Sequence, residues 1–383
     1  MQNIWEKRKL KDIVIVTMGQ SPKSEFYNSE GNGTPFLQGN RTFGSKYPYF
    51  DTFTTKCTKI AKEQDVIMSV RAPVGDLNMI LNVVCLGRGV CSLRMNNDNQ
   101  EFLYYLMKYN TQNLINRESG TVFGSINKRD IEEFEVSIPC NSIQNKISKI
   151  LSSLDEKIEI NRKINENLEE QAKEIFKYKF SNNDNYNMYR IGEYFDISIG
   201  KTPPRKEEQW FSKNESDIVW ISIADMKSSS IYINKSSEYI TNQAIIKHNI
   251  KIIPDNTVIL SFKLTIGRVA ITDGQVTTNE AIAHFKTDKK EITEYLYFYL
   301  KNFNYDTMGS TSSIASAINS KIIKSIPFMV PNEDDLLNFH RIVNPIFQQI
   351  KINQYEIQKL SLLRDELLPK LMTGEIDLSE IDI

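Results

Sequence analysis

Residues 66–75 read VIMSVRAPVG and residues 258–267 read VILSFKLTIG, so the second stretch repeats the first after 192 positions (258 − 66). The same offset relates Ile126-Asn127 to Ile318-Asn319 and Ile138-Pro139 to Val330-Pro331. The offset is about half of the 383-residue chain, far longer than the roughly 20- to 50-residue period of a solenoid. We therefore predict two copies of one domain, suited to a ligand with two similar but unequal half-sites.

Two long helices are predicted at equivalent places in the two copies. Residues 144–180 contain no Gly or Pro. The seam positions from Leu154 to Ile175, which include Asn161 and Asn165, are spaced alternately by four and three, which is a heptad pattern. Such a helix is roughly 55 Å long. Asparagine in such a seam costs stability but can fix the register. The predicted seam residues are Ile147, Leu154, Ile158, Asn161, Asn165, Leu168, Ile346, Ile350, Asn353, Ile357 and Leu360.

The chain is accordingly divided into a globular domain (1–143), a long spacer helix (144–180), a second globular domain (181–332) and a second spacer helix with its tail (333–383). Short β-like runs between Gly, Pro and Asn turns, together with a short helix at 100–117, predict an α+β fold for each domain. We expect the helices to pair antiparallel as a coiled coil between the domains, with pseudo-two-fold symmetry. The alternative is that they are core helices of one compact fold. We place an 11-residue insertion of the second copy around EEQWFSKNESD.

Composition narrows the class of protein. The formal net charge of −1 argues against a uniformly basic surface, although a local basic patch is sufficient to bind nucleic acid. The sequence has neither an apolar run of about 18 residues nor a signal-peptide pattern, so we expect a cytoplasmic protein. All four cysteines (57, 85, 91 and 140) lie in the first copy, and we expect them to be buried thiols in a reducing compartment.

Sequence motifs of catalysis are missing. There is no phosphate-binding loop and no nucleophile elbow. The string nearest to the tetrapeptide of adenine methyltransferases, Thr202-Pro203-Pro204-Arg205, lacks its polar first and aromatic last residues. The three histidines are far apart in the sequence, and a surface or structural role is expected for each of them: His248, His284 and His340. We therefore predict no catalytic residue, no metal site and no cofactor bound by this chain.

Residues that differ between the copies are candidates for base recognition. Gln38, Asn40 and Arg41 align with Ser222, Ala224 and Asp225 after a similar apolar pair. Gln, Asn and Arg are side chains that read base edges with two hydrogen bonds. Ordinary divergence of surface loops is the alternative interpretation.

Basic residues at repeated positions are candidates for contacts to DNA phosphates. Arg71 and Lys263 precede Gly75 and Gly267, where the backbone can pass close to a partner or form a tight turn between strands. Further basic residues follow the repeated asparagines Asn127 and Asn319, where they contact phosphates or begin a solvated helix. The candidate cations at these places are Arg71, Lys128, Arg129, Lys263 and Lys321, and Lys201, Arg205 and Arg268 of the second copy are added as further candidates.

This organisation resembles the specificity subunit of Type I restriction–modification enzymes over essentially the whole chain. The resemblance is carried by the repeated pair quoted above and by three strings: GSINKRDIEEFEVSIP at 124–139, LSSLDEKIEINRKINENLEEQAKEIF at 151–176 and LLPKLMTGEIDL at 367–378. Each motif is soft, but their order and duplication are specific. The globular segments resemble target-recognition domains and the helices resemble conserved spacers.

The resemblance implies a noncatalytic subunit that reads a bipartite, asymmetric target in double-stranded DNA, one half-site per domain. It implies two modification methyltransferase subunits, which bind S-adenosylmethionine and methylate adenine N6, as partners. It also implies restriction motor–nuclease subunits that use ATP and Mg2+. The alternatives are a stand-alone DNA-modifying enzyme and a structural coiled-coil adaptor.

Overall fold

The computed structural model describes residues 5–116, 124–181, 186–228, 230–263, 265–308 and 319–381. The chain forms two compact units, the first made of residues 1–159 with 358–383 and the second of residues 160–357. Of the repeated pairs, Ile318 lies outside the described residues. Each unit contains one globular domain and a part of each long helix.

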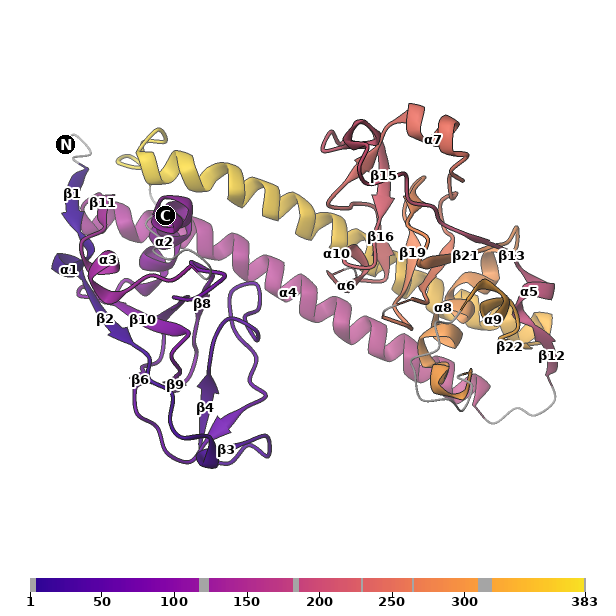
Figure 1. Cartoon of the computed structure of the whole chain (residues 1–383), viewed down its shortest axis with the longest axis horizontal. Coiled ribbons are helices and arrows are strands. Elements are labelled where there is room, and N and C mark those ends of the chain that lie inside the picture. The colour runs from indigo at the N-terminus through magenta and orange to yellow at the C-terminus, as the bar shows by residue number, and fades with distance from the viewer. Residues whose placement is uncertain are drawn as a thin grey trace. The chain divides into compact units, whose positions relative to one another are not determined.

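The first unit contains an antiparallel four-stranded sheet with helix α2 (Gln100–Ile115) against it, as Figure 1 shows. β7 is buried along its whole length, as expected of a strand that packs on both faces. The sheet has the order β2 (Val14–Met18), β10 (Val90–Met95), β7 (Val66–Ser69) and β8 (Leu77–Met79). A second sheet has the order β3 (Tyr27–Asn28), β5 (Phe53–Thr54), β4 (Thr34–Leu37), β9 (Val84–Leu86) and β6 (Ile60–Ala61).

Short elements close the first domain. β1 (Glu6–Lys9) pairs with β11 (Glu135–Ile138), whose alternating exposure is typical of a half-buried strand. Helix α1 (Leu10–Ile13) lies between β1 and β2, and α3 (Lys128–Glu132) precedes β11. Asn127 caps α3 by accepting a hydrogen bond from the Asp130 backbone N–H, and the Asp130 carboxylate accepts one from the Asn127 N–H.

The second unit repeats this order of elements. Its larger sheet is β13 (Asp196–Ile199), β21 (Ile282–Lys286), β18 (Val258–Ser261), β19 (Val269–Thr272) and the additional β16 (Tyr232–Ile233). Its smaller sheet is β14 (Phe211–Ser212), β17 (Tyr239–Ile240), β15 (Ile218–Ile221) and β20 (Thr277–Thr278). The remaining counterparts are β12 (Asn187–Arg190), paired with β22 (Pro327–Val330), and helices α5 (Ile191–Tyr194), α8 (Thr293–Asn302) and α9 (Ser320–Lys324).

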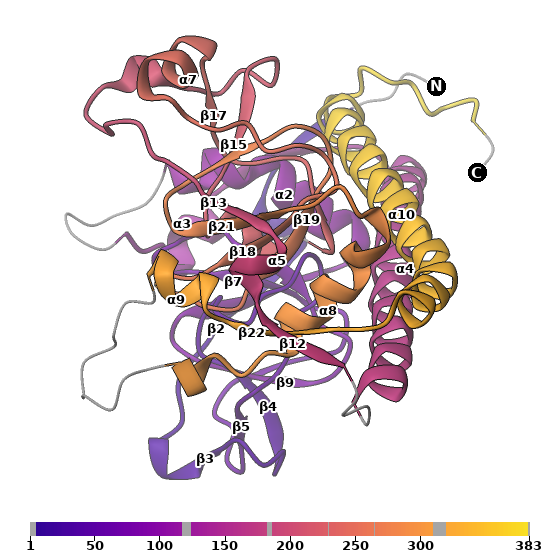
Figure 2. The same cartoon turned by 90° about the vertical axis from the view of Figure 1, so that its right-hand side faces the viewer.

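The insertion in the second copy lies elsewhere than predicted. Counterpart strands β3 and β14 begin 184 residues apart (211 − 27), as do β4 and β15 (218 − 34), whereas β7 and β18 begin 192 apart (258 − 66). Eight of the extra residues therefore follow β15, in the segment that contains α6 (Asp225–Ser228) and α7 (Asn242–His248; Figure 2). The string EEQWFSKNESD contains β14, which is the counterpart of β3, so most of it is not inserted.

Both long helices are continuous. α4 extends over Asn141–Phe180 and α10 over Glu333–Thr373, and α10 ends before Gly374, whose positive φ of 76° is typical of a helix C-terminus. Pro345 lies inside α10, beyond its first turn. With two mixed helix-and-sheet domains and two long helices, the predicted fold class is confirmed.

The helices pair antiparallel within each unit. In the first unit, Arg364 Nη1 lies 2.7 Å from Asp155 Oδ1, and Lys146 Nζ donates to the carbonyl oxygen of Leu378. In the second unit, Asn353 Nδ2 donates to Asn165 Oδ1 over 2.8 Å, while Asn161 Nδ2 donates to Glu356 Oε2. In both units the partner residue number falls as the α4 number rises.

The prediction for the cysteines is wrong in part. Cys57 and Cys85 are joined in a disulfide with a Cα–Cα distance of 5.6 Å, Cys91 is a buried thiol, and Cys140 is exposed. This bridge belongs to the first copy alone, because the second copy contains no cysteine. The cysteines therefore lend no support to a reducing compartment. Among the described residues, we find no helix with the length and apolarity needed to cross a bilayer.

Candidate nucleic-acid interface

A pocket of about 470 Å³ opens on the first domain where three strands end. Gln38 follows β4, Arg71 follows β7 and Arg88 follows β9. The pocket therefore gathers an amide and two guanidinium groups around one opening. Its lining residues are Ser21, Pro22, Ser24, Tyr27, Gln38, Gly39, Asn40, Arg71, Ala72, Arg88 and Gly89.

Two glycines allow these loops to meet. The Gly87 N–H donates to the Leu37 carbonyl over 2.7 Å, and the Gly89 N–H donates to the Gln38 carbonyl over 3.0 Å. A Cβ atom at Gly87 would lie 2.8 Å from the Gln38 Cα, and one at Gly89 would lie 2.4 Å from the Gln38 oxygen. Both glycines are required by the close approach of the two loops.

Neighbouring acidic residues hold two of the predicted contact residues in place. Asn40 Nδ2 donates to Asp76 Oδ2 over 2.6 Å. The two terminal nitrogens of Arg41 each lie 2.7 Å from an oxygen of Asp51, and this pairing lowers the pKa of the Asp51 carboxyl and raises the pKa of Arg41. Arg41 is exposed and is not among the residues that line the pocket.

The corresponding place in the second domain has different chemistry. Ser222, the counterpart of Gln38, donates its hydroxyl to Asp225 Oδ2 over 2.6 Å. Arg268 Nη1 donates to the Ile223 carbonyl, and Lys201 Nζ donates to the His248 carbonyl. Backbone carbonyls and a carboxylate thus bind the side chains of Arg268, Lys201 and Ser222 in the second domain.

An acidic side chain lies among the cations of the second domain. Thr202 Oγ1 donates to the Glu280 carboxylate. Partial burial by itself raises the pKa of Glu280, but the Thr202 hydrogen bond, a backbone hydrogen bond and the nearby charges of Lys263 and Arg205 outweigh it, so this pKa is lowered. Glu280 is therefore an ionised acceptor beside two of the predicted cations.

Arg205 is oriented by aromatic rings. Its guanidinium carbon lies 4.3 Å from the centre of the Phe211 ring and 4.5 Å from that of Trp220, and it forms an ion pair of 2.8 Å with Glu238. Stacking and the ion pair, in which Nη1 contacts both oxygens of Glu238, together restrict this side chain. The equivalent ring pair of the first domain, Tyr27 and Phe36, has its centroids 4.7 Å apart.

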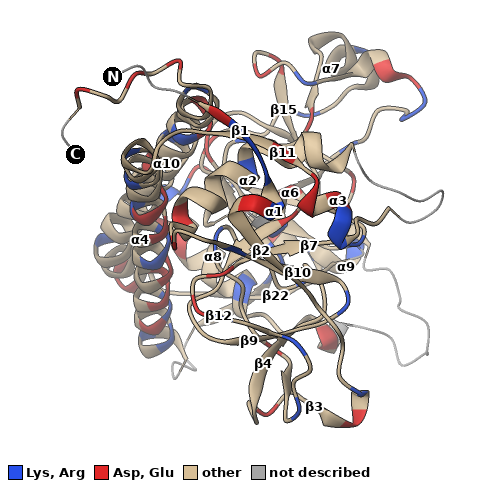
Figure 3. Cartoon of the chain, turned by 90° about the vertical axis from the view of Figure 1, so that its left-hand side faces the viewer, with Lys and Arg blue, Asp and Glu red and all other residues tan. Residues whose placement is uncertain are grey.

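The remaining predicted cations begin two short helices. Lys128 and Arg129 are the first residues of α3 (Figure 3), and Lys321 lies in the first turn of α9. Lys128 Nζ lies 3.4 Å from Glu132. Arg71, which lines the pocket, forms an isolated β-bridge with Ser125. Helix α3 begins three residues after Ser125, at Lys128. For Lys128 and Arg129 the two interpretations do not exclude each other, because these residues begin a short helix that follows the strand partner of Arg71.

The turn glycines Gly75 and Gly267 have positive φ angles of 93° and 88° and lie in the antiparallel hairpins β7–β8 and β18–β19. Gly75 and Gly267 therefore form tight turns between strands, which is the second of the two interpretations given from the sequence. The neighbouring cations differ in place: Arg71 lines the pocket, while Lys263 lies 5.7 Å from the centre of the Phe262 ring.

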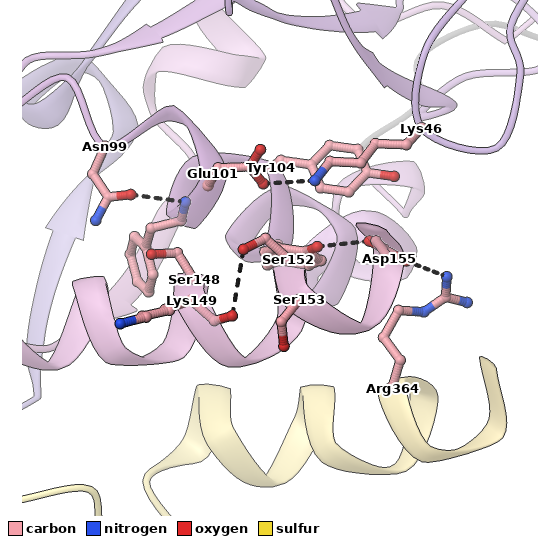
Figure 4. Close-up of polar contacts among 12 residues, drawn as sticks. Lys46, Asn99, Glu101, Tyr104, Ser148, Lys149, Ser152, Ser153, Asp155 and Arg364 are labelled. Atoms are coloured by element: carbon pink, nitrogen blue, oxygen red, sulfur yellow. Dashed lines mark hydrogen bonds and ion pairs between the residues drawn. The ribbon is translucent and has the colours of Figure 1, made fainter. Parts of the chain in front are cut away.

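The predicted helix seam is buried to different degrees. Ile147, Ile158, Asn161, Asn165, Ile350 and Asn353 are buried, whereas Leu154, Leu168, Ile346, Ile357 and Leu360 are half-buried. In the first unit, Tyr105 of α2 donates to Asp155 Oδ2 over 2.6 Å, and Arg364 pairs with the other oxygen (Figure 4). The seam prediction missed Asp155, because a carboxylate at an interior position is not expected from a heptad of apolar residues.

Two of the histidines are tied into the second unit. His284 is buried between Ser198 and Thr278, within hydrogen-bond distance of both hydroxyls, and burial lowers its pKa to about 3. His340 Nδ1 lies 2.8 Å from Glu294 Oε2. Within the described ranges no three His, Cys, Asp or Glu side chains are arranged to hold a metal ion.

The pocket is also lined by Arg88, which is not among the contact residues predicted from the sequence. Its counterpart at the 192-residue offset is Glu280, and this reversal of charge was visible in the sequence. Comparing the copies position by position after β9 would have identified both.

The two domains share one fold but carry different polar groups at equivalent places. This combination is typical of a protein that recognises two different nucleic-acid sequences. The family model described as "Type I restriction modification DNA specificity domain" matches this chain twice, at residues 3–170 and 183–362. The matches cover most of the chain, and the chain belongs to this family.

Individual relatives agree with this. The chain is 26% identical to the Type I restriction enzyme MjaIX specificity subunit of Methanocaldococcus jannaschii, over 98% of this chain and 94% of the relative. It is 39% identical to a protein assigned as the MjaX specificity subunit of the same organism, over 45% of this chain and 41% of that relative. The crystal structure of a Type I restriction–modification S subunit from M. genitalium matches 97% of this chain at 17% identity with a TM-score of 0.61, which shows the shared fold. The resemblance stated from the sequence is confirmed.

Proposed function

We propose that this chain is the DNA-reading subunit of a Type I restriction–modification complex and that each domain reads one half of a bipartite, asymmetric duplex target. The observation that carries this proposal is the difference between equivalent places in two copies of one fold. The first domain offers Gln38, Asn40, Arg71 and Arg88, whereas the second offers Ser222, Lys263 and Glu280. Unlike groups on equal scaffolds favour unlike sequences in the two half-sites.

In this proposal the long helices dock two modification methyltransferase subunits. Apolar side chains remain exposed on both: Leu362 (62%) and Leu363 (42%) in the first unit, and Ile160 (52%) and Ile352 (59%) in the second. Exposed apolar side chains gathered on a helix are typical of a surface that binds a protein partner. S-adenosylmethionine would be bound by those partners, and ATP and Mg2+ by motor–nuclease subunits, all in the cytoplasm.

The test uses the full chain purified with the modification subunits of its own system. The complex is incubated with a library of random duplexes, and bound duplexes are sequenced. We expect one motif made of two unlike parts with a fixed gap, and we expect replacement of residues 1–143 by the equivalent domain of a relative to change only one part. Enrichment of no motif, or a change in both parts, would contradict the proposal.

A second measurement separates this function from that of a stand-alone enzyme. The chain alone, incubated with labelled S-adenosylmethionine and mixed DNA, should transfer no methyl group, whereas the complex should label the selected duplexes. Methyl transfer by the chain alone would contradict a noncatalytic role. A complex that forms but binds every duplex equally would indicate a structural adaptor.

A further inference from the structure

Residues 88 and 280 occupy the same place in the two domains, and contacts in each unit establish this independently of the sequence offset. The Arg88 backbone N–H donates to Ser21 Oγ over 3.1 Å, while Thr202 Oγ1 donates to the Glu280 carboxylate. Ser21 and Thr202 are themselves counterparts. Each lies two residues after a glycine, Gly19 or Gly200, and directly before a proline.

The backbone around the two positions is also the same. The residue before each donates its N–H to the last residue of the parallel partner strand: Gly87 to Leu37 over 2.7 Å, and Asn279 to Ile221 over 3.0 Å. The neighbouring glycines bond in the same way, Gly19 to Val90 over 3.0 Å and Gly200 to Ile282 over 3.1 Å. The side chains at 88 and 280 therefore leave the same point of each fold with opposite charge.

Arg88 is available to a ligand. It is exposed at the pocket shared with Gln38 and Arg71, and within the described residues its guanidinium makes no hydrogen bond or ion pair. This distinguishes it from Arg41 and Arg205, whose guanidinium groups are held by Asp51 and Glu238. A guanidinium offers only donors, and guanine O6 and N7 are the pair of acceptors that it matches in the major groove.

Glu280 needs hydrogen-bond donors from a ligand, whereas Arg88 needs acceptors. An ionised carboxylate only accepts hydrogen bonds, and it is repelled by DNA phosphates. Lys263 and Arg205 act on it with opposite charge, which offsets that repulsion, and the exocyclic amino group of cytosine is the base donor that a carboxylate recognises.

We propose that residues 88 and 280 are specificity-determining residues at equivalent positions, Arg88 for a guanine in one half-site and Glu280 for a cytosine in the other. This inference rests on the proposed function. It goes further by assigning a base class to one residue in each domain.

The test is the library selection described above, repeated on the full chain with its modification subunits for Arg88→Gln and Glu280→Gln. Glutamine pairs with adenine N6 and N7. Arg88→Gln should therefore change one guanine of the first half-site to adenine, and Glu280→Gln should change one cytosine of the other half-site to adenine. Affinity for the original target should fall by about 5- to 160-fold, which corresponds to loss of about 1–3 kcal/mol of discrimination.

Matched controls are Arg8→Gln on β1 and Glu333→Gln in the first turn of α10, two exposed charges outside the residues that surround positions 88 and 280. Both should leave the motif unchanged. If Arg88→Gln weakens binding to all duplexes equally, Arg88 contacts a phosphate and the inference fails. If Glu280→Gln leaves the motif unchanged, Glu280 only orders Lys263 and Arg205 and the inference fails. A wild-type complex that enriches no motif contradicts the proposed function itself, which is a distinguishable result.

Discussion

Each unit buries a carboxylate between its globular domain and the long helices. In one unit the carboxylate belongs to a long helix, and in the other it belongs to the globular domain. In the first unit the carboxylate is Asp155 of α4, which accepts from Tyr105 and pairs with Arg364. In the second it is Glu294 of α8, which is held by His340 and Asn344 of α10. At the 192-residue offset, the counterpart of Asp155 is Phe347 and the counterpart of Glu294 is Phe102, and both rings are fully buried. One fold therefore accepts a charge or a ring at either site, provided that the partners change with it.

The largest expected effect comes from breaking the first of these networks. Asp155→Ala should destabilise the first unit by about 3 kcal/mol, the lower end for a broken buried pair, because Arg364 keeps the exposed Asp365 as a second partner. The double variant Asp155→Phe with Arg364→Ala installs the residues of the other copy, Phe347 and Ala172, and should recover most of that loss. Hydrogen exchange of the β7 and β10 amides in the full chain measures both. A double variant no more stable than Asp155→Ala would show that the two interfaces are not interchangeable.

Acid should affect the second unit more than the first. His284 has Ser92 as its counterpart, and burial holds the pKa of His284 at about 3, below the ordinary value of 6.5. The unfolded chain therefore binds a proton that the folded chain does not, so stability falls as the pH falls from about 6.5 toward 3. By pH 5 the loss is about 2 kcal/mol.

The measurement compares the exchange of β18 and β21 amides at pH 7 and pH 5, corrected for the intrinsic rate. Wild-type protection should fall about 30-fold for a loss of about 2 kcal/mol. In His284→Gln, whose amide can still bond Ser198 and Thr278, this fall should be absent. An equal fall in both proteins would assign the acid sensitivity to other groups.

The paired asparagines of the seam allow a comparison within one unit. Asn161 and Asn353 are counterparts, but Asn353 donates to the buried Asn165 while Asn161 donates to the half-buried Glu356. Asn353→Ala should cost about 1–2 kcal/mol because the Asn165 oxygen loses its donor away from water. Asn161→Ala should cost less, because water can reach Glu356. Exchange of the surrounding α4 amides measures both, and the reverse order would contradict this account.

The smallest expected effect concerns the short helices α3 and α9. The first begins with Lys128-Arg129 and the second with Ser320-Lys321. If these cations contact phosphates, Lys128→Ser should lower the slope of log affinity against log salt concentration by about one unit, and Ser320→Lys should raise it by about one. Both changes should leave the selected motif intact. Titration of the complex with its target at several salt concentrations gives the slope, and an unchanged slope would remove this position from the interface.

Much of the fold follows from the sequence, because a repeat and a heptad are patterns of apolar residues and apolar residues determine the core. The strings around Val66 and Val258 are equivalent buried strands, and the helix predicted at 100–117 is α2. The insertion was misplaced because the short strand that contains Phe211 has no distinctive pattern. The disulfide was missed because the distance between Cys57 and Cys85 is set by the pairing of short strands, which the sequence does not reveal.

The candidate site was less predictable. Gln38, Asn40 and Arg71 were identified by residue type and do line one pocket, whereas Arg41 was equally plausible and is held by Asp51 outside it. The difference depends on which side chains find a carboxylate partner, and that is a tertiary property. Arg88 and Glu280 were not predicted because motifs are residues that the two copies have in common. A site that distinguishes two ligands depends instead on positions at which the copies differ, and Arg88 and Glu280 are such a pair.

Asp155 and Glu169 each form an ion pair that joins the two repeats of the chain. Asp155 belongs to the first repeat and Arg364 to the second, while Glu169 of the first repeat forms an ion pair with Lys301 of the second. The counterpart of Arg364 is Ala172 and that of Glu169 is Ser361. A protein rebuilt from two identical first repeats would leave Asp155 without its arginine, and one rebuilt from two second repeats would leave Lys301 without its acid. Each unit therefore contains an ion pair between the two repeats that neither repeat could form with a second copy of itself.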